Sequence, residues 1–166
     1  MALPRWFARF VARPMVSRIA LHIATAVDRP LMRLSGGRVR LSFVIPVLLL
    51  RCRGARSGVR REVPLLYVPD GDHALLVASN GGQAHEPAWA HNLRAYPRVS
   101  ALMSEGEHGY HAEELEGSER AEAWARALQV YPGYSVYAER ITRTIAVFRL
   151  HRLVDDAPTS AKGTRL

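Results

Sequence analysis

Two glycine-bearing loops carry the residues whose types and spacing best suit the binding of an anion. The first runs Gly54-Ala55-Arg56-Ser57-Gly58-Val59-Arg60-Arg61, and the second runs Ser79-Asn80-Gly81-Gly82. Glycine lets backbone N–H groups approach phosphate or carboxylate oxygens without a Cβ in the way, and guanidinium groups grip the same oxygens in a bidentate fork. Because one hairpin separates the two loops, we expect them to converge on one anionic ligand, as in a cofactor site.

Three tyrosines, Tyr131, Tyr134 and Tyr137, recur at every third position. On a helix this spacing spreads them over one side. They then form either a packed aromatic face or a set of phenols covering a flat ligand, with a hydroxyl that supplies a proton to a reduced product. The spacing alone favours the packed face.

Other kinds of chemistry have little support in the sequence. His108, His111 and Glu113 are the best metal-ligand cluster, but positions 108 and 111 point to opposite faces of a strand, so we expect no metal. The chain has no P-loop, no G-x-S-x-G nucleophile elbow and no G-x-G-x-x-G fingerprint after a strand. The single Cys52 rules out an internal disulfide framework, fits a reducing cytoplasm and is expected to be a buried strand residue.

The net charge of +8 is concentrated at the N-terminal end of the chain. Residues 1–61 hold thirteen arginines and one acid, Asp28, for a charge of +12, whereas residues 62–166 carry −4. This asymmetry predicts that the N-terminal third contacts anionic lipid, an anionic cofactor or nucleic acid. Uncharged apolar runs, such as residues 41–50, are far shorter than the ~20 residues of a membrane-spanning helix, and arginines interrupt any signal-peptide core.

Residues 1–33 are predicted to form a basic amphipathic helical extension. Apolar side chains follow helical spacing from Leu3 to Val11, arginines fall on a different side, and a second helical run follows Pro14. Two interpretations stay open: residues 1–27 lie on an anionic membrane, or the helix folds back over the domain. Residues 154–166 are predicted to be a disordered tail.

Residues 34–153 are predicted to form one domain dominated by strands. Residues 47–50 read as a buried strand, and Asp70-Gly71 and Glu105-Gly106 read as the turns of two antiparallel hairpins.

Helices are expected at residues 86–95, from an N-cap at Ser118 to about residue 131, and around residues 134–137, before a closing strand at 144–153. Five or six strands joined mainly by hairpins predict a small antiparallel barrel with flanking helices.

The ordered set of motifs from Leu50 to Leu93 resembles the deazaflavin-dependent nitroreductase family, whose members use coenzyme F420. The matching residues are, in order, Gly54-x-Arg56-Ser57-Gly58-x-x-Arg61, Pro64-Leu65, Asp70-Gly71, Ala78-Ser79-x-Gly81-Gly82, Pro87-x-Trp89-x-x-Asn92-Leu93 and Pro97. Further matches are Tyr131-Pro132-x-Tyr134, Tyr137 and Arg143-Thr144-Ile145, so the resemblance covers about residues 34–152.

The resemblance implies a mainly β fold with flanking helices, a split β-barrel of the flavin-binding type, holding F420 in an extended groove. An arginine-rich cradle suits the phosphate and glutamate tail of F420, and an apolar slot suits its ring. Tyr131, Tyr134, Tyr137 and Ser79 would shape the acceptor pocket, with one hydroxyl as proton donor. The implied cofactor-binding residues are Arg56, Ser57, Arg60, Arg61, Pro64, Val77, Ser79, Asn80, Gly81, Gly82, Pro87, Trp89 and Asn92.

The leading functional hypothesis is an F420H2-dependent reductase that transfers a hydride to a quinone-like, nitroaromatic or other hydrophobic acceptor. It would act in the cytoplasm or at the inner face of the cell membrane, as a monomer or a homodimer. A second hypothesis keeps the barrel but binds FMN or haem. A third is a non-enzymatic basic module for lipid or nucleic acid. Nucleic acid is disfavoured because the basic surplus lies largely in the N-terminal extension and the cofactor-like loop.

Overall fold

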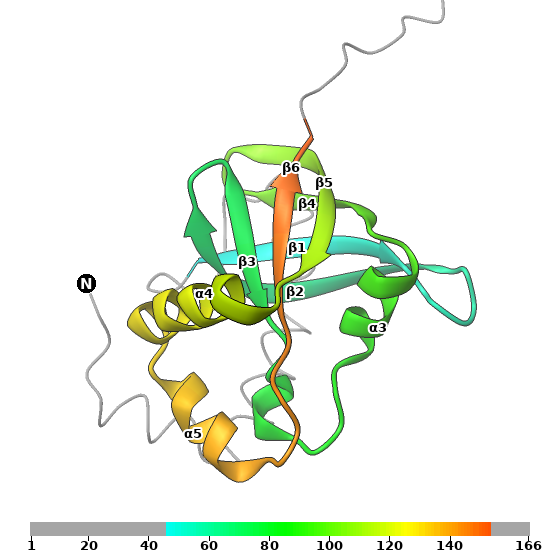
Figure 1. Ribbon diagram of the computed structural model, residues 1–166. Helices are drawn as coiled ribbons and strands as arrows, with labels where there is room; N and C mark the ends of the chain where they lie inside the picture. Colours follow the sequence, from blue (N-terminus) through cyan, green and yellow to red (C-terminus); the bar gives the residue numbers. More distant parts are fainter. Residues whose placement is uncertain (1–45, 154–166) are drawn as a thin grey trace, which may run out of the picture.

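Six strands form the centre of residues 46–153, the part of the chain that the computed structural model describes. In the order β1-β2-β3-β6-β5-β4 they close into a barrel in which neighbouring strands run antiparallel (Figure 1). The barrel with flanking helices that the sequence predicts is thus confirmed. The strands are β1 (Val47–Arg53), β2 (Arg60–Asp70), β3 (His73–Val77), β4 (Arg98–Met103), β5 (Gly106–Glu114) and β6 (Val147–Arg152).

Both predicted hairpins are present. β2 and β3 meet at the pair Asp70↔His73, and β4 and β5 meet at Met103↔Gly106. Pro64 is tolerated within β2 because it lies opposite Leu49 of β1, outside the part of β2 that pairs with β3. A proline has no N–H to donate to a ladder, so it fits where the strand has only one paired neighbour.

Strand parity divides the apolar residues between the barrel interior and its outer face. On β3, Ala74 and Leu76 pack in the interior, whereas Leu75 and Val77 pack outside against the helices. Alternate side chains of a strand point to opposite faces, so a strand that is apolar throughout must be covered on both. The same reasoning applies to β6, where Phe148 is interior and Val147 is exterior.

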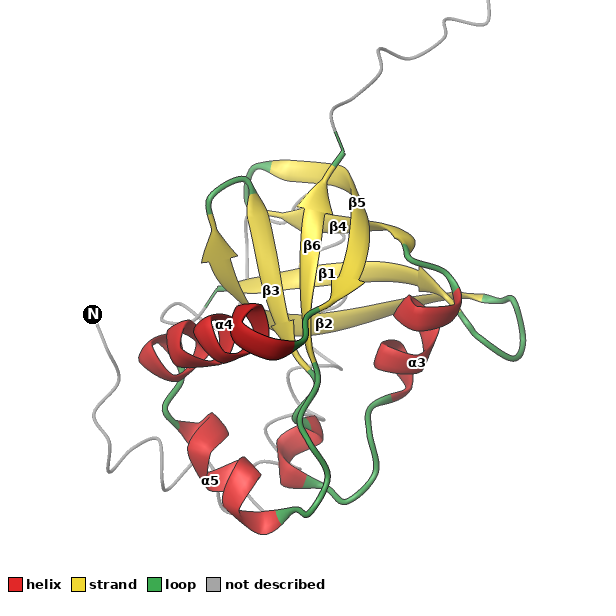
Figure 2. Cartoon of the chain, viewed as in Figure 1, coloured by secondary structure: helices red, strands yellow, loops and turns green. Residues whose placement is uncertain are grey.

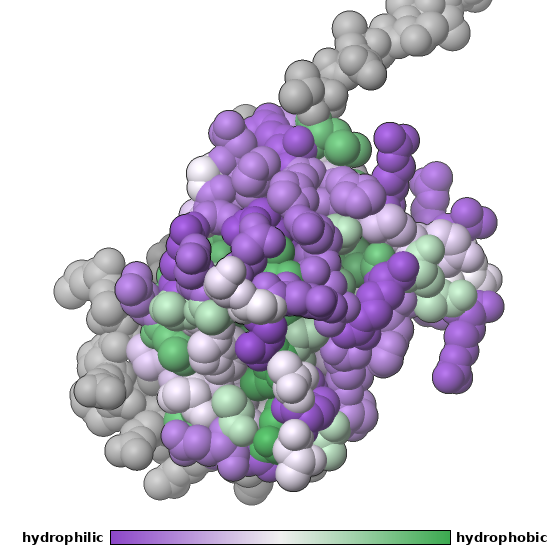
Figure 3. Space-filling model, in the orientation of Figure 1, coloured by the Kyte–Doolittle hydropathy of each residue, from purple (hydrophilic) through white to green (hydrophobic). Residues whose placement is uncertain are grey.

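Among the described residues, three helices and one short turn lie outside the barrel (Figure 2). These elements are the 3-10 turn η1 (Asn80–Gly82), α3 (Ala88–Ala95), α4 (Gly117–Val130) and α5 (Gly133–Arg140). Figure 1 shows α4 across the strands and α5 below the barrel. The space-filling view shows the same side of the molecule (Figure 3). Its lower half exposes apolar residues among polar ones, whereas its upper half is mostly hydrophilic. The helical layer therefore covers one end of the barrel.

Three predicted boundaries are wrong. The helix predicted at residues 86–95 begins at Ala88, with Pro87 as its N-cap. Ser118 is not the N-cap of α4: the helix begins at Gly117, the cap position is Glu116, and its carbonyl accepts the first helical hydrogen bond from the N–H of Arg120. The closing strand begins at Val147 and not at residue 144. The residues before it are held differently, because Arg120 donates to the carbonyl of Ile145 and Arg143 turns towards η1.

The predicted N-terminal extension and C-terminal tail lie outside the described residues. Within residues 46–153, none of the helices has the length and apolar character that crossing a bilayer requires. The interpretations of residues 1–27 therefore stay predictions.

Candidate active site

The second glycine loop forms η1, a tight turn with an unusual backbone. Asn80, Gly81 and Gly82 all have positive φ, at 48°, 62° and 76°. The turn is closed by hydrogen bonds from the N–H of Gly82 to the carbonyl of Ser79 (2.9 Å) and from the N–H of Gln83 to the carbonyl of Asn80 (3.2 Å). A left-handed conformation is costly for a residue with a Cβ, so Asn80 needs support from its surroundings. Its side-chain amide gives some, donating to the carbonyl of His85 at 3.1 Å.

Gly82 brings η1 into direct contact with the tyrosine cluster, which we define as Tyr131, Tyr134 and Tyr137. A Cβ on Gly82 would lie 3.0 Å from the Cδ1 atom of Tyr137 and 3.3 Å from its Cα atom. Only a glycine both adopts this φ and allows so close an approach. The contact joins the loop that the resemblance assigns to the cofactor to the tyrosines that it assigns to the acceptor pocket.

The tyrosine cluster is buried and packed ring against ring. All three residues have exposed fractions of 5% or less. The rings of Tyr131 and Tyr134 meet edge to face at 5.1 Å, and the hydroxyls of Tyr131 and Tyr137 are hydrogen-bonded at 3.1 Å. Tyr131 follows α4, whereas the other two belong to α5, so the three come from two elements and not from one helix. The packed aromatic face that the spacing favours is therefore present.

Burial raises the pKa of Tyr131 and of Tyr134 above the ordinary phenol value, and in Tyr131 the neighbouring Tyr137 raises it further. A phenol with a raised pKa keeps its proton at neutral pH. The phenols therefore stay protonated and can act as hydrogen-bond donors.

Gly133 allows the ring of Tyr131 to fold back over the start of α5. A Cβ at position 133 would lie 2.4 Å from the Cζ atom of Tyr131 and 2.6 Å from its hydroxyl oxygen. Side-chain atoms cannot approach a Cβ so closely. The position of the Tyr131 hydroxyl thus depends on a missing side chain two residues further along the chain.

The first glycine loop joins β1 to β2 and is anchored to α3 by Asn92. The Oδ1 atom of Asn92 accepts a hydrogen bond from the N–H of Ala55 at 2.8 Å, and its Nδ2 atom donates to the Sγ atom of Cys52 at 3.6 Å. Inside the loop, Arg53 donates to the carbonyl of Gly58 and lies over the ring of Tyr96. Asn92, which is buried, therefore fixes this loop from the side of α3.

Three arginines around this loop remain available to a ligand. Arg56, Arg60 and Arg61 are exposed, and within residues 46–153 no carboxylate pairs with them. Several other arginines in the same range do pair with carboxylates, namely Arg51, Arg94, Arg126 and Arg149. Unpaired guanidiniums on one loop are the donor set that a phosphate or a chain of carboxylates requires. The resemblance assigns this loop to the charged tail of F420, and that assignment stays a prediction.

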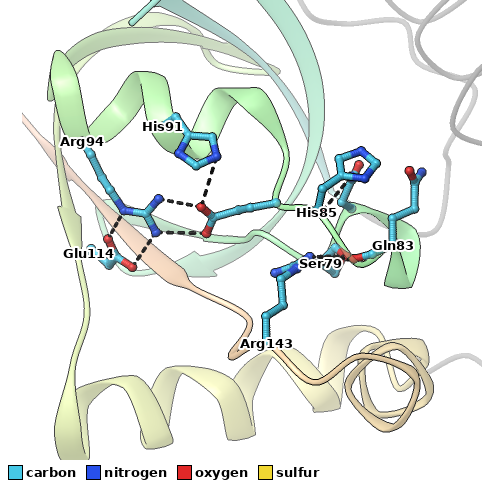
Figure 4. A network of polar contacts seen from close by, with 9 residues as sticks. Ser79, Gln83, His85, His91, Arg94, Glu114 and Arg143 are labelled. Atoms are coloured by element: carbon cyan, nitrogen blue, oxygen red, sulfur yellow. Dashed lines mark hydrogen bonds and ion pairs between the residues drawn. The ribbon is translucent and has the colours of Figure 1, made fainter.

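Between the two loops, an ion network holds α3 against β5 (Figure 4). Arg94 donates to Glu86 through Nη1 at 2.6 Å and to Glu114 through Nη2 at 2.8 Å, and His91 lies 3.6 Å from Glu86. Hydrogen bonding to Arg94 lowers the pKa of Glu86, and the two carboxylates raise the pKa of Arg94. The network fixes the residues between η1 and α3.

Most of the predicted site residues fall into two groups in the structure, and a segment of the chain connects the groups. The group around η1 brings together Val77, Ser79, Asn80, Gly81, Gly82, Tyr131, Tyr134 and Tyr137. The group at the β1–β2 loop contains Arg56, Ser57, Arg60, Arg61 and Asn92. The two loops are connected through residues 83–95.

The remaining predicted residues have structural surroundings of their own. Pro87 is the N-cap of α3. Trp89 points into the barrel, where its ring meets Phe148 edge to face at 5.7 Å. Pro64 is buried in β2. Their roles as cofactor contacts stay predictions.

Sequence reasoning did not assign a role to Glu86, Arg94 or Arg143. The two ion partners of Arg94 lie 8 and 20 positions away, and Arg143 bonds to backbone carbonyls 60 and 64 positions away. Backbone acceptors leave no trace in a sequence, so no spacing rule could have found the role of Arg143.

Comparison with known proteins places this chain in a family. The chain matches the family described as F420H(2)-dependent quinone reductase over residues 25–152. It is 33% identical over 157 residues to an F420H(2)-dependent quinone reductase of Mycobacterium tuberculosis, covering 92% of this chain and 99% of that protein.

Solved structures agree with this match. An F420-H2 dependent reductase, FDR-A, is 37% identical with a TM-score of 0.60, covering 64% of this chain and 94% of that one. A protein described as a domain-swapped dimer is 34% identical with a TM-score of 0.63, covering 75% and 96%. The heme storage protein HutZ of Vibrio cholerae is 14% identical with a TM-score of 0.52, covering 78% and 92%, and this likeness concerns the fold alone. The chain therefore belongs to the F420H(2)-dependent quinone reductase family.

Proposed function

We propose that this protein binds F420 between the β1–β2 loop and the tyrosine cluster and reduces a quinone with it. Its family membership makes it an oxidoreductase with F420 as cofactor. When bound in the reduced form, this cofactor supplies a hydride. The residues described below supply binding, orientation and protection from water.

The observation that carries the proposal is the contact between Gly82 of η1 and Tyr137 of α5. It supports a single site, because a ligand beside η1 is also next to the tyrosine cluster. Two reactants must be held at near-attack distance for a transfer to be fast, and adjacent rigid elements provide that. Ser79, at the start of η1, and the three phenols would line the space between the two reactants.

At the other end of the site, Arg56, Arg60 and Arg61 would hold the phosphate and glutamate tail. Their charges are exposed and unpaired within the described residues, so binding does not first require an ion pair to break. Bidentate guanidinium contacts with phosphate or carboxylate are among the stronger hydrogen bonds in proteins. Asn92 would keep the loop in place during binding.

The tyrosine cluster would orient the acceptor. Its phenols keep their protons because burial raises the pKa of Tyr131 and Tyr134. A protonated phenol can donate a hydrogen bond to a quinone oxygen, which becomes more negative as the hydride arrives. The same chemistry would accommodate the oxygens of a nitroaromatic acceptor.

A titration followed by a reduction assay tests the proposal. F420 is added to the purified protein and its fluorescence is followed, and then F420H2 oxidation is followed after addition of a quinone or a nitroaromatic. We expect quenching with saturation, and faster turnover with the quinone. Absorbance of the purified protein before F420 is added distinguishes an FMN or haem barrel, since either group is coloured. A protein that neither quenches F420 fluorescence nor oxidises F420H2 would refute the proposal.

Membrane contact by residues 1–27 is a separate part of the proposal. It is motivated by the charge of +12 in residues 1–61 and the aromatic residues near the N-terminus. Deletion of residues 2–30 should leave F420 binding intact and abolish sedimentation with anionic vesicles. Equal sedimentation of the full-length and deleted proteins would contradict it.

A further inference from the structure

Arg143 reaches from the segment between α5 and β6 to both ends of η1. Its Nη2 atom donates to the carbonyl of Ser79 at 3.1 Å and to the carbonyl of Gln83 at 3.3 Å, and its Nε atom lies 3.4 Å from the carbonyl of Gln83. Figure 4 shows the guanidinium directed at these residues. One side chain therefore brackets the turn that contains Asn80, Gly81 and Gly82.

The bracketed turn is the part of the site that most needs external support. Its three residues have positive φ, one of them is not a glycine, and Gly82 lies against Tyr137. Backbone in a sparsely populated conformation persists only where its surroundings hold it. If the bracket were removed, η1 could relax away from α5, and both Ser79 and the Tyr137 contact would move.

The chemistry of Arg143 differs from that of the paired arginines. Its hydrogen bonds go to neutral carbonyls, and its Nη1 atom is buried without a partner in the described part of the chain. Burial lowers its pKa, with Glu86 acting in the opposite direction. Leaving a charged nitrogen unsatisfied is costly, so the bonds to the carbonyls of Ser79 and Gln83 must offset this cost.

We propose that Arg143 is the positioning residue of the active site, holding η1 against α5 so that the cofactor side and the acceptor side keep one geometry. This inference rests on the proposed function, because it takes η1 and the tyrosine cluster to be the two sides of the reaction. The inference adds to the proposed site a residue that contacts neither the cofactor nor the acceptor.

The chain supplies a matched control in Arg120. Its Nη2 atom donates to the carbonyl of Ile145 at 2.7 Å, on the same segment as Arg143, and its Nε atom is likewise buried without a partner in residues 46–153. Arg120 belongs to α4 and lies over the ring of Trp124. Its substitution disturbs the anchoring of the segment without removing a bond to η1.

The experiment compares Arg143→Met, Arg143→Lys and Arg120→Met with the wild type in two measurements. The first is the F420 dissociation constant from fluorescence quenching, without acceptor. The second is hydrogen exchange at residues 79–83, where the N–H groups of Gly82 and Gln83 close the turn. Arg143→Met should weaken F420 binding about tenfold, which corresponds to about 1.4 kcal/mol, because the turn that contacts the cofactor is no longer held in one conformation.

Arg143→Met should also speed exchange at residues 79–83, whereas Arg120→Met should leave both quantities unchanged. Lysine is a point charge that cannot bracket two carbonyls in the same way, so Arg143→Lys should fall between wild type and Arg143→Met. In steady-state assays, Arg143→Met should lower kcat as well as raise KM, because the relative position of the two reactants changes.

Every other outcome contradicts either the positioning role of Arg143 or the proposed function. Wild-type affinity and exchange in Arg143→Met, or equal losses in Arg143→Met and Arg120→Met, would contradict the positioning role. If Arg143→Met does not fold, Arg143→Lys decides: unchanged exchange at residues 79–83, or failure to fold as well, would make Arg143 a folding residue only. If the wild type does not bind F420, the proposed function fails, and hydrogen exchange still tests the bracket on its own.

Discussion

Asn92 uses both ends of its side-chain amide inside the protein. It is 8% exposed, accepts from the N–H of Ala55 and donates towards the sulfur of Cys52. Burial raises the pKa of the Cys52 thiol, so the sulfur stays protonated and acts as a weak acceptor. A residue that the resemblance places beside the cofactor thus has a structural task as well.

Replacement of Asn92 by alanine should lower the free energy of unfolding by about 1–3 kcal/mol, because the N–H of Ala55 loses its partner. The measurement is urea denaturation followed by circular dichroism. Asn92→Asp keeps the acceptor for Ala55 and should lose less. Equal stability of Asn92→Ala and wild type would show that water replaces the amide at no cost.

Gly133 offers a second test at the same scale. Gly133→Ala places a Cβ within 2.6 Å of the Tyr131 ring, so the ring must move and break its hydroxyl contact with Tyr137. Overpacking of this kind costs about 1–3 kcal/mol, measurable as a lower denaturation midpoint. Gly109→Ala is the matched control, since its Cβ would meet Leu153 at an ordinary 3.5 Å. A larger loss in Gly109→Ala than in Gly133→Ala would contradict the reading of the Tyr131 contact.

Among the elements, α3 is held to the barrel by apolar packing and by the network around Arg94. Ala90 and Leu93 face the core, whereas Glu86, Arg94 and Glu114 connect the start of the helix to β5. Such networks respond to pH. The pKa of Glu86 is lowered mainly by Arg94, with smaller effects of His91 and Arg143.

A carboxylate with a lowered pKa stabilises the fold above its ordinary pKa of 4.5 and loses this contribution as the pH falls through its folded-state pKa. The free energy of unfolding should therefore fall as the pH drops below 4.5, and Glu86→Gln should show a shallower fall. Urea denaturation across this range measures the slope. Glu122→Gln, an exposed residue of α4, should keep the wild-type slope. Equal slopes for Glu86→Gln and wild type would exclude this carboxylate as a source of acid sensitivity.

For individual elements, the sequence was a good guide where a local signal sets the structure. Asp70-Gly71 and Glu105-Gly106 marked the hairpins because tight turns depend on two or three adjacent residues. The start of α4 was missed because Glu116 caps it through its backbone and without a side-chain hydrogen bond. The start of β6 was missed because distant arginines hold the residues before it.

At the scale of the whole molecule, the barrel and the region around α5 are stabilised differently. β3 and β6 lie between two strands each and are covered on both faces, whereas α5 packs on η1 and α4. Local stability follows the number of buried apolar neighbours and paired backbone groups. The helix α5, which lies next to the proposed site, should therefore open more easily than the strands of the barrel.

Hydrogen exchange should show this difference directly. Amides of α5 should exchange through local opening at a lower free energy than amides of β3 and β6, and F420 at about a hundred times its dissociation constant should protect them by up to about 2.7 kcal/mol. Mass spectrometry of exchanged peptides, with and without F420, makes the comparison. Protection of α5 equal to that of β6 in the unliganded protein would contradict it.

The barrel class could be predicted because six short strands with tight turns leave few ways to bury their apolar faces. The relative position of the two glycine loops could not be predicted from the sequence, because it depends on where residues 83–95 lie. The loops were expected to converge, and the structure connects them through α3, with Asn92 as the link. Spacing along a strand or helix identifies which side chains share a face, but not which elements come to rest between two loops.

β1 and β4 pair only from Leu49 to Arg51, whereas every other ladder of the barrel is longer. The β1–β4 pairing is therefore the weakest ladder of the barrel, and heating or mechanical force should separate these two strands before any others. Once β1 and β4 separate, two unpaired strand edges are exposed to water. Unpaired edges of this kind allow copies of a protein to exchange strands.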